Sequence, residues 1–519
     1  MLLISEKYGF KIDFKMNIIK SKLGLVFVLF FPFGQVQAIT FQDYLNSARK
    51  EVSQIFSPQQ SSPNKINIQT LNSFQLDLPQ EREVLPVVTH STIKPVGSKK
   101  IPLLSRSTQQ KEVSLIDAIH QALQQHPDIS QSIASMAGQN ANIDTAKAQY
   151  YPQISGGLST ADLTTGERGR QLYTLSATQM VYDFGKVKNS VHTEEAKLLE
   201  KQAMLLTSID NIAFQTVNAI VNINRYQEVV KIAEQQVQGI ARIAEIANLR
   251  ARAGISSQAD PIQAQSNLEA AESNKLTQEA ALKQYQQKLR TLLGYDVTAA
   301  QFNIPDYIVR NAGLYQEPEF KRIPQMMAAQ AGVEIAKSQK EQAKLTTYPT
   351  IQVKGSLNQA LNGKNPNNNE DDGLYSSVML EANSNFFQGG AIRSRLRAAS
   401  YAEDAAKAQV NVVYRDVTDQ VGLLREQVGN KQKQMEVLGA RRETTARTKE
   451  LYQEQYKLGT RTVVDLLNSE QAIHSVAQEI ENARYDIYAG LIEYIYVTGR
   501  SRDFYQLNNV SIQGIEVGP

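Results

Sequence analysis

The spacing of apolar residues changes along the chain in an order that occurs twice. Between residues 114 and 149 apolar side chains recur at every third or fourth position, which is the period of one face of an α-helix. The first turns show this spacing in Leu115, Ala118, Ile119, Ala122 and Leu123. We expect the helix to end before Tyr151-Pro152, because proline lacks an amide hydrogen and disfavours helix in the residue before it. A shorter stretch with the same period, 323–345, precedes Tyr348-Pro349.

Alternating apolar and polar residues follow each Tyr-Pro pair. Tyr173, Leu175 and Ala177 alternate with threonine and serine, and Ile351 and Val353 alternate with glutamine and lysine. Because successive side chains of a strand point to opposite faces, this pattern predicts β-hairpins at 151–183 and 349–388. Such two-faced strands occur in membrane barrels, where lipid covers the apolar face, and also in soluble sheets, where the protein itself covers it. The strand pattern alone leaves both alternatives open.

Two long stretches without proline follow the hairpins, at 186–253 and 391–458. In the second, apolar residues recur at intervals of three and four, through Ala406, Val410, Val413, Val417, Val421, Leu424 and Val428. Sustained spacing of this kind is typical of coiled coils, and a helix of ~67 residues is ~100 Å long. Beyond Gly254 and Gly459 the pattern predicts shorter returning helices at 261–293 and 462–497.

The repeated order of elements indicates an internal duplication. Pro127 and Pro152 are 25 residues apart, as are Pro324 and Pro349. Gly254 and Asp260 are six residues apart, as are Gly459 and Asp465. The two copies are offset by 197 residues early and by 205 residues late, so the second copy contains about eight additional residues. The Asn-rich stretch 358–373 is the obvious place for this insertion.

The N-terminus has the three parts of a secretory signal. Lys15, Lys20 and Lys22 are basic, residues 23–33 are apolar, and Val36-Gln37-Ala38 is a cleavage site of small residues, with Met16 as an alternative start. The alternative, an N-terminal membrane anchor, is disfavoured because the apolar run is shorter than the ~20 residues that a membrane-spanning helix needs. We therefore predict a signal peptide at 1–38. The Gln-, Ser- and Pro-rich residues 39–111 are expected to form a flexible periplasmic extension.

Composition argues against several classes of function. The 519-residue chain has a net charge of +3 and no clustered basic face, so no nucleic-acid partner is expected. It has no cysteine, which excludes disulfides, thiolate catalysis and a lipid-modified N-terminal cysteine. The five histidines show no metal-ligand spacing, and no nucleophile motif or phosphate loop is present. We expect no enzyme, cofactor or metal; the acidic Glu370-Asp371-Asp372 is interpreted as a solvated loop, with calcium binding as the alternative.

Four strands are too few for a membrane barrel of their own. A closed barrel needs about eight strands, and an open sheet edge is not tolerated in lipid. If the hairpins cross a membrane, the barrel must be shared between subunits.

One segment of the second repeat is especially specific. It reads Tyr456-Lys457-Leu458-Gly459-Thr460-Arg461-Thr462-Val463-Val464-Asp465-Leu466-Leu467, followed by Glu481-Asn482-Ala483-Arg484-Tyr485. With this segment and the order of elements above, the chain resembles, over residues 113–500, the TolC family of outer-membrane efflux and type I secretion channels. The resemblance implies an α+β membrane protein, a homotrimer with four strands per subunit. These strands would form a 12-stranded transmembrane β-barrel, continued by a long α-helical coiled-coil tunnel in the periplasm. The repeats would be 112–300 and 323–500, and a small mixed equatorial region would come from 301–322 and 501–519.

The resemblance also implies a gate at the periplasmic end of the tunnel. The family's latch positions fall on Asp260, Tyr456 and Arg461. An Arg–carboxylate pair suits this role because its hydrogen bonds are directional, yet only modestly stabilising where water reaches them. The alternative is helix capping. Asp260-Pro261 fits an N-cap followed by proline at the first helical position, and Thr462 to Asp465 fits a capping box.

Two further sets of residues follow from the resemblance. The family's constriction is lined by two acidic rings, which fall here on Asp465 and on Asn468. Because Asn468 is not acidic, one carboxylate ring would remain in a trimer and any block by cations should be weaker. Contact with a periplasmic adaptor falls on the tips of the two helical hairpins: Gly254, Ile255, Ser256, Leu458, Gly459 and Thr460. Glycine at a helix C-terminus is also ordinary capping.

These implications predict an outer-membrane exit duct of a Gram-negative bacterium. It would passively conduct protein or small molecules from an inner-membrane ABC or RND-type transporter through a periplasmic adaptor (membrane fusion) protein, with outer-membrane lipid around its barrel. The absence of a cysteine for lipid attachment favours type I secretion over a dedicated multidrug efflux channel. A non-channel structural coiled-coil envelope protein is the third interpretation.

Overall fold

The structure is a computed structural model and describes residues 65–66, 112–161, 170–298, 300–304, 306–361 and 373–518. All of these belong to one unit of the chain, 61–519. The expected signal peptide, the extension 39–111 except for two residues, and the acidic loop residues 370–372 lie outside the described residues.

The first helical stretch is divided in two. Helix α4 covers Leu115–Gln125 and α5 covers Pro127–Ala148, so the expectation of one helix over 114–149 was wrong. The break is at His126, whose extended backbone precedes Pro127 as the first residue of α5. The Nδ1 atom of His126 accepts a hydrogen bond of 3.2 Å from the amide of Asp128. Proline is well tolerated at a first helical position, and here it starts a new helix instead of continuing the old one.

The long and returning helices have equal lengths in the two repeats. Helices α6 (Lys186–Arg252) and α10 (Ala391–Lys457) each have 67 residues. Helices α7 (Ala259–Leu293) and α11 (Val463–Val497) each have 35 residues. The shorter α9 covers Pro324–Leu345. The predicted duplication of helices is thus present in the structure.

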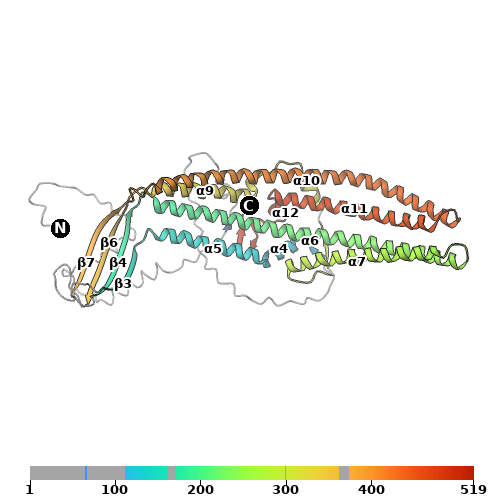
Figure 1. Cartoon of the computed structure of the whole chain (residues 1–519), viewed down its shortest axis with the longest axis horizontal. Coiled ribbons are helices and arrows are strands. Elements are labelled where there is room, and N and C mark those ends of the chain that lie inside the picture. Colours follow the sequence, from blue (N-terminus) through green and yellow to red (C-terminus); the bar gives the residue numbers. More distant parts are fainter. Residues whose placement is uncertain are drawn as a thin grey trace, which may run out of the picture. The chain divides into compact units, whose positions relative to one another are not determined.

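The two hairpins form one four-stranded antiparallel sheet. Its strands are β3 (Gln153–Ala161), β4 (Arg170–Tyr182), β6 (Thr350–Leu361) and β7 (Leu374–Asn383). Their order is β3-β4-β6-β7 (Figure 1), so the repeats join where β4 pairs with β6. The register is duplicated as well, because Gln153 pairs with Thr178 as Thr350 pairs with Asn383. The second hairpin ends at Asn383, earlier than the expected 388.

The two faces of this sheet differ in polarity. One face gathers Ile154, Leu158, Tyr173, Leu175, Leu357, Leu374, Val378 and Leu380. The other face carries one serine from each strand in a single row: Ser155, Ser176, Ser356 and Ser377. Hydroxyl oxygens within this row are 2.8 Å apart in the β3–β4 and β6–β7 pairs. The apolar face is uncovered, since Ile154 is 72% exposed and Leu158 75%.

The helices lie side by side in the order of the strands. Helix α6 contacts α5 and α9 along one part of its length and α7 and α11 along the other, while α10 contacts α9 and α11 (Figure 1). The layer is therefore α5-α6-α9-α10 next to the sheet and α7-α6-α11-α10 beyond it. As a consequence, α6 buries 26 of its residues and α10 only seven. Among the described helices α6 is long and apolar enough to cross a membrane, but 61% of its most apolar stretch is buried against its neighbours.

Short elements pack around the middle of the helices. Strand β2 (Glu112–Ser114) pairs in parallel with β5 (Gln301–Asn303), and β9 (Ile515–Val517) lies between β8 (Ser511–Ile512) and β1 (Lys65–Ile66). Short helices cover Asp306–Asn311 (α8), Phe320–Arg322 (η2) and Ser501–Phe504 (α12). Together with α4 they enclose the largest apolar core, which contains the fully buried Tyr494 and Tyr505.

A buried ionic pair joins α6 to α12 inside this core. Asp210 is 1% exposed and Arg502 3% exposed, and their Oδ1 and Nε atoms are 3.8 Å apart. Neither carboxylate oxygen of Asp210 has a hydrogen-bond partner among the described residues. Burial raises the pKa of Asp210 to about 6; the nearby Arg502 opposes the shift and Asp503 adds to it.

This pair predicts a distinctive dependence of stability on pH. Because the pKa of Asp210 is higher in the folded protein than its ordinary value of 3.8, the folded state binds more protons between pH 4 and pH 6. Asp210 therefore contributes roughly 2–4 kcal/mol of stability at low pH, which is lost as the pH rises through about 6. Thermal unfolding of the wild type and of Asp210→Asn, followed from pH 4 to 7.5, should show the wild type gaining stability on acidification relative to the variant. Parallel curves for the two proteins would contradict the assignment.

Candidate functional site

The tips of the two helical hairpins have the same backbone structure. After α6, Gly254 has φ +72°, and the amide of Ile255 donates to the carbonyl of Arg250 at 2.9 Å. After α10, Gly459 has φ +75°, and the amide of Thr460 donates to the carbonyl of Gln455 at 3.0 Å. Both are Schellman motifs, in which a left-handed glycine ends the helix. The turns expose apolar side chains, since Ile255 is 65% and Leu458 77% exposed.

An apolar cluster holds the two hairpins together close to these tips. It contains residues of all four helices: Ile240, Ile243, Ala247, Ala264, Ala271, Tyr456, Val463, Leu466 and Leu467. Burial of these side chains fixes the hairpins side by side within one chain. The polar residues at the tips are thereby placed on a common support.

Tyr456 is the anchor of this cluster on α10, and its partner is Arg250 of α6. Tyr456 is only 5% exposed. The guanidinium carbon of Arg250 lies 4.8 Å from the centre of its ring, and Nη1 donates to its carbonyl oxygen at 3.2 Å. A cation over an aromatic face and a hydrogen bond to the same residue reinforce each other. The sequence pattern did not single out Arg250, which reads there as a basic residue at a helix C-terminus.

The carboxylate of Asp260 acts electrostatically on the phenol of Tyr456. The pKa of the Tyr456 phenol is raised, mainly because the group is buried, and the carboxylate of Asp260 adds to this effect while Arg250 opposes it. The phenol oxygen has no hydrogen-bond partner among the described residues. Within one chain the residues at these two expected latch positions thus influence each other electrostatically, and the phenol forms no hydrogen bond with the carboxylate.

Arg461 interacts with its own hairpin. Its Nε atom donates to Oε1 of Gln455 at 2.9 Å, and its guanidinium lies 4.6 Å from the centre of the Tyr452 ring. Nη1 is 3.8 Å from a carboxylate oxygen of Asp465. Within a single chain Arg461 is thus paired with Asp465, and its side chain is exposed enough to exchange this partner for another.

The capping alternative is confirmed in one hairpin and wrong in the other. Thr462 and Asp465 form a capping box, in which the Thr462 hydroxyl accepts from the amide of Asp465 at 3.2 Å. Asp260, in contrast, is not an N-cap. Helix α7 begins at Ala259 after Gln258, so Asp260 is its second residue and Pro261 its third. The hydroxyl of Ser257 accepts the hydrogen bond from Ala259 instead, at 3.1 Å.

The two expected constriction residues lie one helical turn apart on α11. Asp465 is partly exposed and engaged with Thr462 and Arg461, whereas Asn468 is exposed. Both project from the same side of the helix, because residues three apart share a face. The carboxylate of Asp465 therefore belongs to the capping box, whether or not it also lines a constriction in a trimer.

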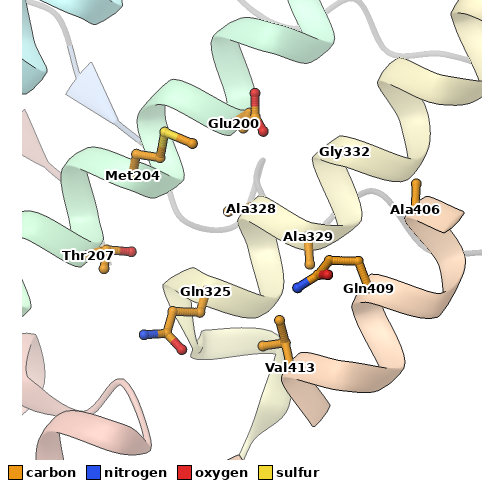
Figure 2. A pocket seen from close by; sticks show the side chains of 10 residues that line it. All are labelled: Glu200, Met204, Thr207, Gln325, Ala328, Ala329, Gly332, Ala406, Gln409 and Val413. Atoms are coloured by element: carbon orange, nitrogen blue, oxygen red, sulfur yellow. The ribbon is translucent and has the colours of Figure 1, made fainter. Parts of the chain in front are cut away.

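A groove of about 460 Å³ lies between α6, α9 and α10. Figure 2 shows its lining, with Ala328, Ala329 and Gly332 of α9 facing Glu200, Met204 and Thr207 of α6. Glu200 is the only ionisable side chain in this lining, so the groove lacks the paired groups that acid–base catalysis requires. Among the described residues no group of three or more potential metal ligands occurs.

Comparison with known proteins decides the family. A family model described as "Outer membrane efflux protein" matches residues 118–295 and 319–493, about two thirds of the chain. The chain belongs to the outer membrane efflux protein family. Outer membrane protein TolC of Escherichia coli (strain K12) is 22% identical over 434 residues, which are 78% of this chain and 86% of the relative. Protein CyaE of Bordetella pertussis is 27% identical over 306 residues, 56% of this chain and 63% of the relative.

Solved structures show the same fold. The outer membrane protein VceC of Vibrio cholerae superposes with a TM-score of 0.65 at 16% identity, over 74% of this chain and 96% of VceC. Membership in the family confirms the resemblance found in the sequence and the outer-membrane location in Gram-negative bacteria. This outer membrane efflux protein is therefore a channel protein and not an enzyme, and the alternative of a non-channel coiled-coil protein is set aside.

The tip contacts predict which substitutions loosen the tips of the two helical hairpins. Arg250→Ala removes the cation and the hydrogen bond at Tyr456, so the single-channel conductance of the purified protein in planar bilayers should rise several-fold. Arg252→Ala is the matched control, because Arg252 is an exposed arginine of the same turn. Asp260→Ala and Arg461→Ala should raise the conductance as well if these residues act as a latch. Unchanged conductance in the last two would leave capping and local pairing as their only roles.

Proposed function

We propose that this outer membrane efflux protein is a homotrimeric exit duct, with a 12-stranded barrel in the outer membrane and a helical tunnel in the periplasm. The observation that carries the proposal is the uncovered apolar face of the sheet. A soluble sheet would bury Ile154, Leu158 and Leu380, whereas each is more than 70% exposed here. Lipid would cover this face, and water would fill the side that carries the serine row.

The sheet and the helical layer each have two open edges, which supports closure with other copies. Strands β3 and β7 are paired on one side only within the described residues. They run in opposite directions, so β7 of one subunit can continue the antiparallel order by pairing with β3 of the next. Helix α10 would then lie against α5 and α7 of the neighbour. Its exposed apolar residues are those that such contacts would bury: Tyr401, Val412, Tyr414, Leu423, Val437 and Leu451.

The end of β7 supports the same arrangement. Strand β4, paired on both sides, continues to Tyr182. The position equivalent to Tyr182 in the second repeat is Phe387, yet β7 ends at Asn383. Phe386 and Phe387 are 89% and 83% exposed. Pairing with β3 of a neighbouring subunit would extend β7 through Phe386 and Phe387. In the same way, pairing with β6 keeps β4 extended as far as Tyr182.

The tip residues would form the gate of this duct. Arg461, which pairs with Asp465 within one chain, would exchange this partner for Asp260 of an adjacent subunit, and Tyr456 with Arg250 would keep the tips of each subunit together. One ring of three Asp465 carboxylates would line the constriction, with Asn468 next to it. The exposed turns at Gly254, Ile255 and Ser256 and at Leu458, Gly459 and Thr460 would receive the periplasmic adaptor.

Type I secretion is the favoured pathway, with a dedicated multidrug efflux channel as the alternative. The chain contains no cysteine to which a lipid anchor could be attached. The duct contains no energy source, so an inner-membrane ABC or RND-type transporter would drive export through the adaptor.

The inter-subunit register can be tested directly because the chain has no native cysteine. In β4 and β6, Ala177 pairs with Gly355. The duplicated register then places Ala382 opposite Leu158 of the next subunit. The variant Ala382→Cys/Leu158→Cys should form covalent dimers and trimers on oxidation, visible on a non-reducing gel. Ala382→Cys/Ile154→Cys is the control, because its thiols would be ~13 Å out of register at ~3.3 Å per residue. Equal cross-linking in both pairs, or none in the first, would overturn the arrangement.

Secretion assays distinguish the two pathways. A Gram-negative host lacking its own exit channel would receive this chain together with an ABC transporter and adaptor encoded in the same genome. We expect a reporter protein carrying a C-terminal secretion signal to appear in the medium only when all three are present. Restored drug tolerance without secretion of the reporter would favour the multidrug alternative.

A further inference from the structure

The groove between α6, α9 and α10 lies where α9 carries small residues. Ala328, Ala329 and Gly332 leave a hollow of about 460 Å³ between Met204 of α6 and Val413 of α10 (Figure 2). Sites for small molecules typically have a volume of roughly 300–1,000 Å³. The lining is mostly apolar, and Met204 is 42% exposed. Its flexible thioether can adapt to ligands of different shape.

A single carboxylate, that of Glu200, belongs to this apolar lining. Within the described part of the chain its side chain forms no ion pair and no hydrogen bond. The neighbouring lysines are paired with other carboxylates, Lys197 with Glu194 at 2.7 Å and Lys407 with Glu403 at 2.6 Å. The groove thus carries a negative charge that no cation of its lining balances, and apolar surroundings strengthen the attraction of such a charge for a cation.

One lysine lies at the rim of the groove. Nζ of Lys201 is 4.0 Å from Sδ of Met204 and forms no ion pair within the described residues. A thioether is a weak acceptor, so this contact holds the ammonium group only loosely. Lys201 would therefore compete with a bound cation without filling the groove itself.

The other repeat differs at the equivalent positions. With the offset of 197 residues, Ala328 and Gly332 correspond to Gln131 and Ser135 of α5. In the proposed trimer, α5 of the next subunit would therefore present a polar surface to α10 at this level. The apolar groove would occur once in each subunit.

The groove and the short elements lie on different sides of the helical layer. Asp210 faces α12 and projects from α6 about 120° away from Met204, because successive helical residues differ by ~100°. On α10, Tyr414 lies against Phe320 of η2, with ring centres 4.6 Å apart, whereas Val413 lines the groove. Three copies of the short elements would fill a tunnel if they lay inside it. In the proposed duct the groove would therefore open to the inside.

We propose that this groove binds a small amphipathic cation, whose apolar groups contact α9 and Met204 and whose charge pairs with Glu200. The site is complete within one chain, because all its lining residues belong to the same subunit. Only its position on the inner wall rests on the proposed function. A cation bound there would narrow the passage.

Binding can be tested with two probes of nearly the same shape and opposite charge, tetraphenylphosphonium and tetraphenylborate. The purified protein in detergent would be dialysed against each probe, and binding to empty micelles subtracted. We expect saturable binding of the cation, with one molecule per subunit, and binding of the anion at least ten-fold weaker. Equal binding of both probes, or no binding of the cation to folded protein, would overturn the inference.

Two substitutions should change the affinity for tetraphenylphosphonium in opposite directions. Glu200→Gln should weaken binding at least ten-fold, since an interaction with a charged group contributes about this much. Lys201→Gln should strengthen binding several-fold, because it removes the competing ammonium group. Glu195→Gln is the matched control, as Glu195 is an exposed carboxylate of the same helix outside the lining. Equal affinities of the Glu200→Gln and Glu195→Gln variants would show that Glu200 is not the partner of the cation.

Filling the groove provides a second test. A Cβ atom at Gly332 or at Gly138 of α5 would meet nothing within 4 Å, so neither substitution starts from a clash. Both variants gain helix propensity when glycine is replaced by leucine. Gly332→Leu should abolish binding of tetraphenylphosphonium, and Gly138→Leu, outside the groove, should leave it unchanged. Wild-type binding by Gly332→Leu would contradict the location of the site.

Conductance separates the site from the function on which its position rests. In planar bilayers, tetraphenylphosphonium should lower the single-channel conductance of the wild type, and Glu200→Gln should require at least ten-fold more of it. Binding without any change in conductance would overturn the position on the inner wall, and with it the proposed orientation of the helical layer. Absence of binding by trimers that conduct normally would overturn the site and leave the duct intact.

Discussion

The structure depends on the fact that backbone hydrogen-bonding groups and apolar faces cannot remain uncovered at the edge of a sheet or a helical layer. Where the two repeats join, these groups are covered: β4 pairs with β6, and α6 packs against α9 and α11. At the outer edge of the unit, in contrast, β7 is paired on one side only and α10 buries only seven residues within the described part of the chain. The difference in burial between α6 and α10 agrees with these positions, since α6 is central and α10 lies at the edge. Two helices of equal length and related sequence have different environments because one is central and the other lies at the edge.

Most of the fold could be predicted from the sequence because its elements show the spacing of apolar residues over long stretches. Helices of 67 and 35 residues repeat their spacing many times, and the internal duplication provides each observation twice. The predictions were wrong at helix boundaries, where the conformation of a single residue determines whether a helix ends or begins. Pro127 could equally end a helix or begin one, and only the extended backbone of His126 shows which occurred. Asp260-Pro261 has the composition of a cap, but the helix starts two residues earlier, at Ala259.

The site was less predictable than the fold, because its contacts join residues that are distant in sequence. Arg250 and Tyr456, for example, are separated by 206 positions. No periodic pattern marks such pairs.

The serine row has a consequence for what the duct can distinguish. On the proposed arrangement, the middle of the water-filled wall presents hydroxyl and amide groups, as in the 2.9 Å bond that Thr174 donates to Asn358. Such groups donate and accept equally well and are already satisfied by one another, so they attract neither cations nor anions strongly. At the serine row the wall would therefore sort molecules by width more than by charge, whereas the charged groups of the same face, Lys354 and Glu381, lie two and four residues farther toward the helices. The duct would thereby remain usable by any transporter able to dock with it.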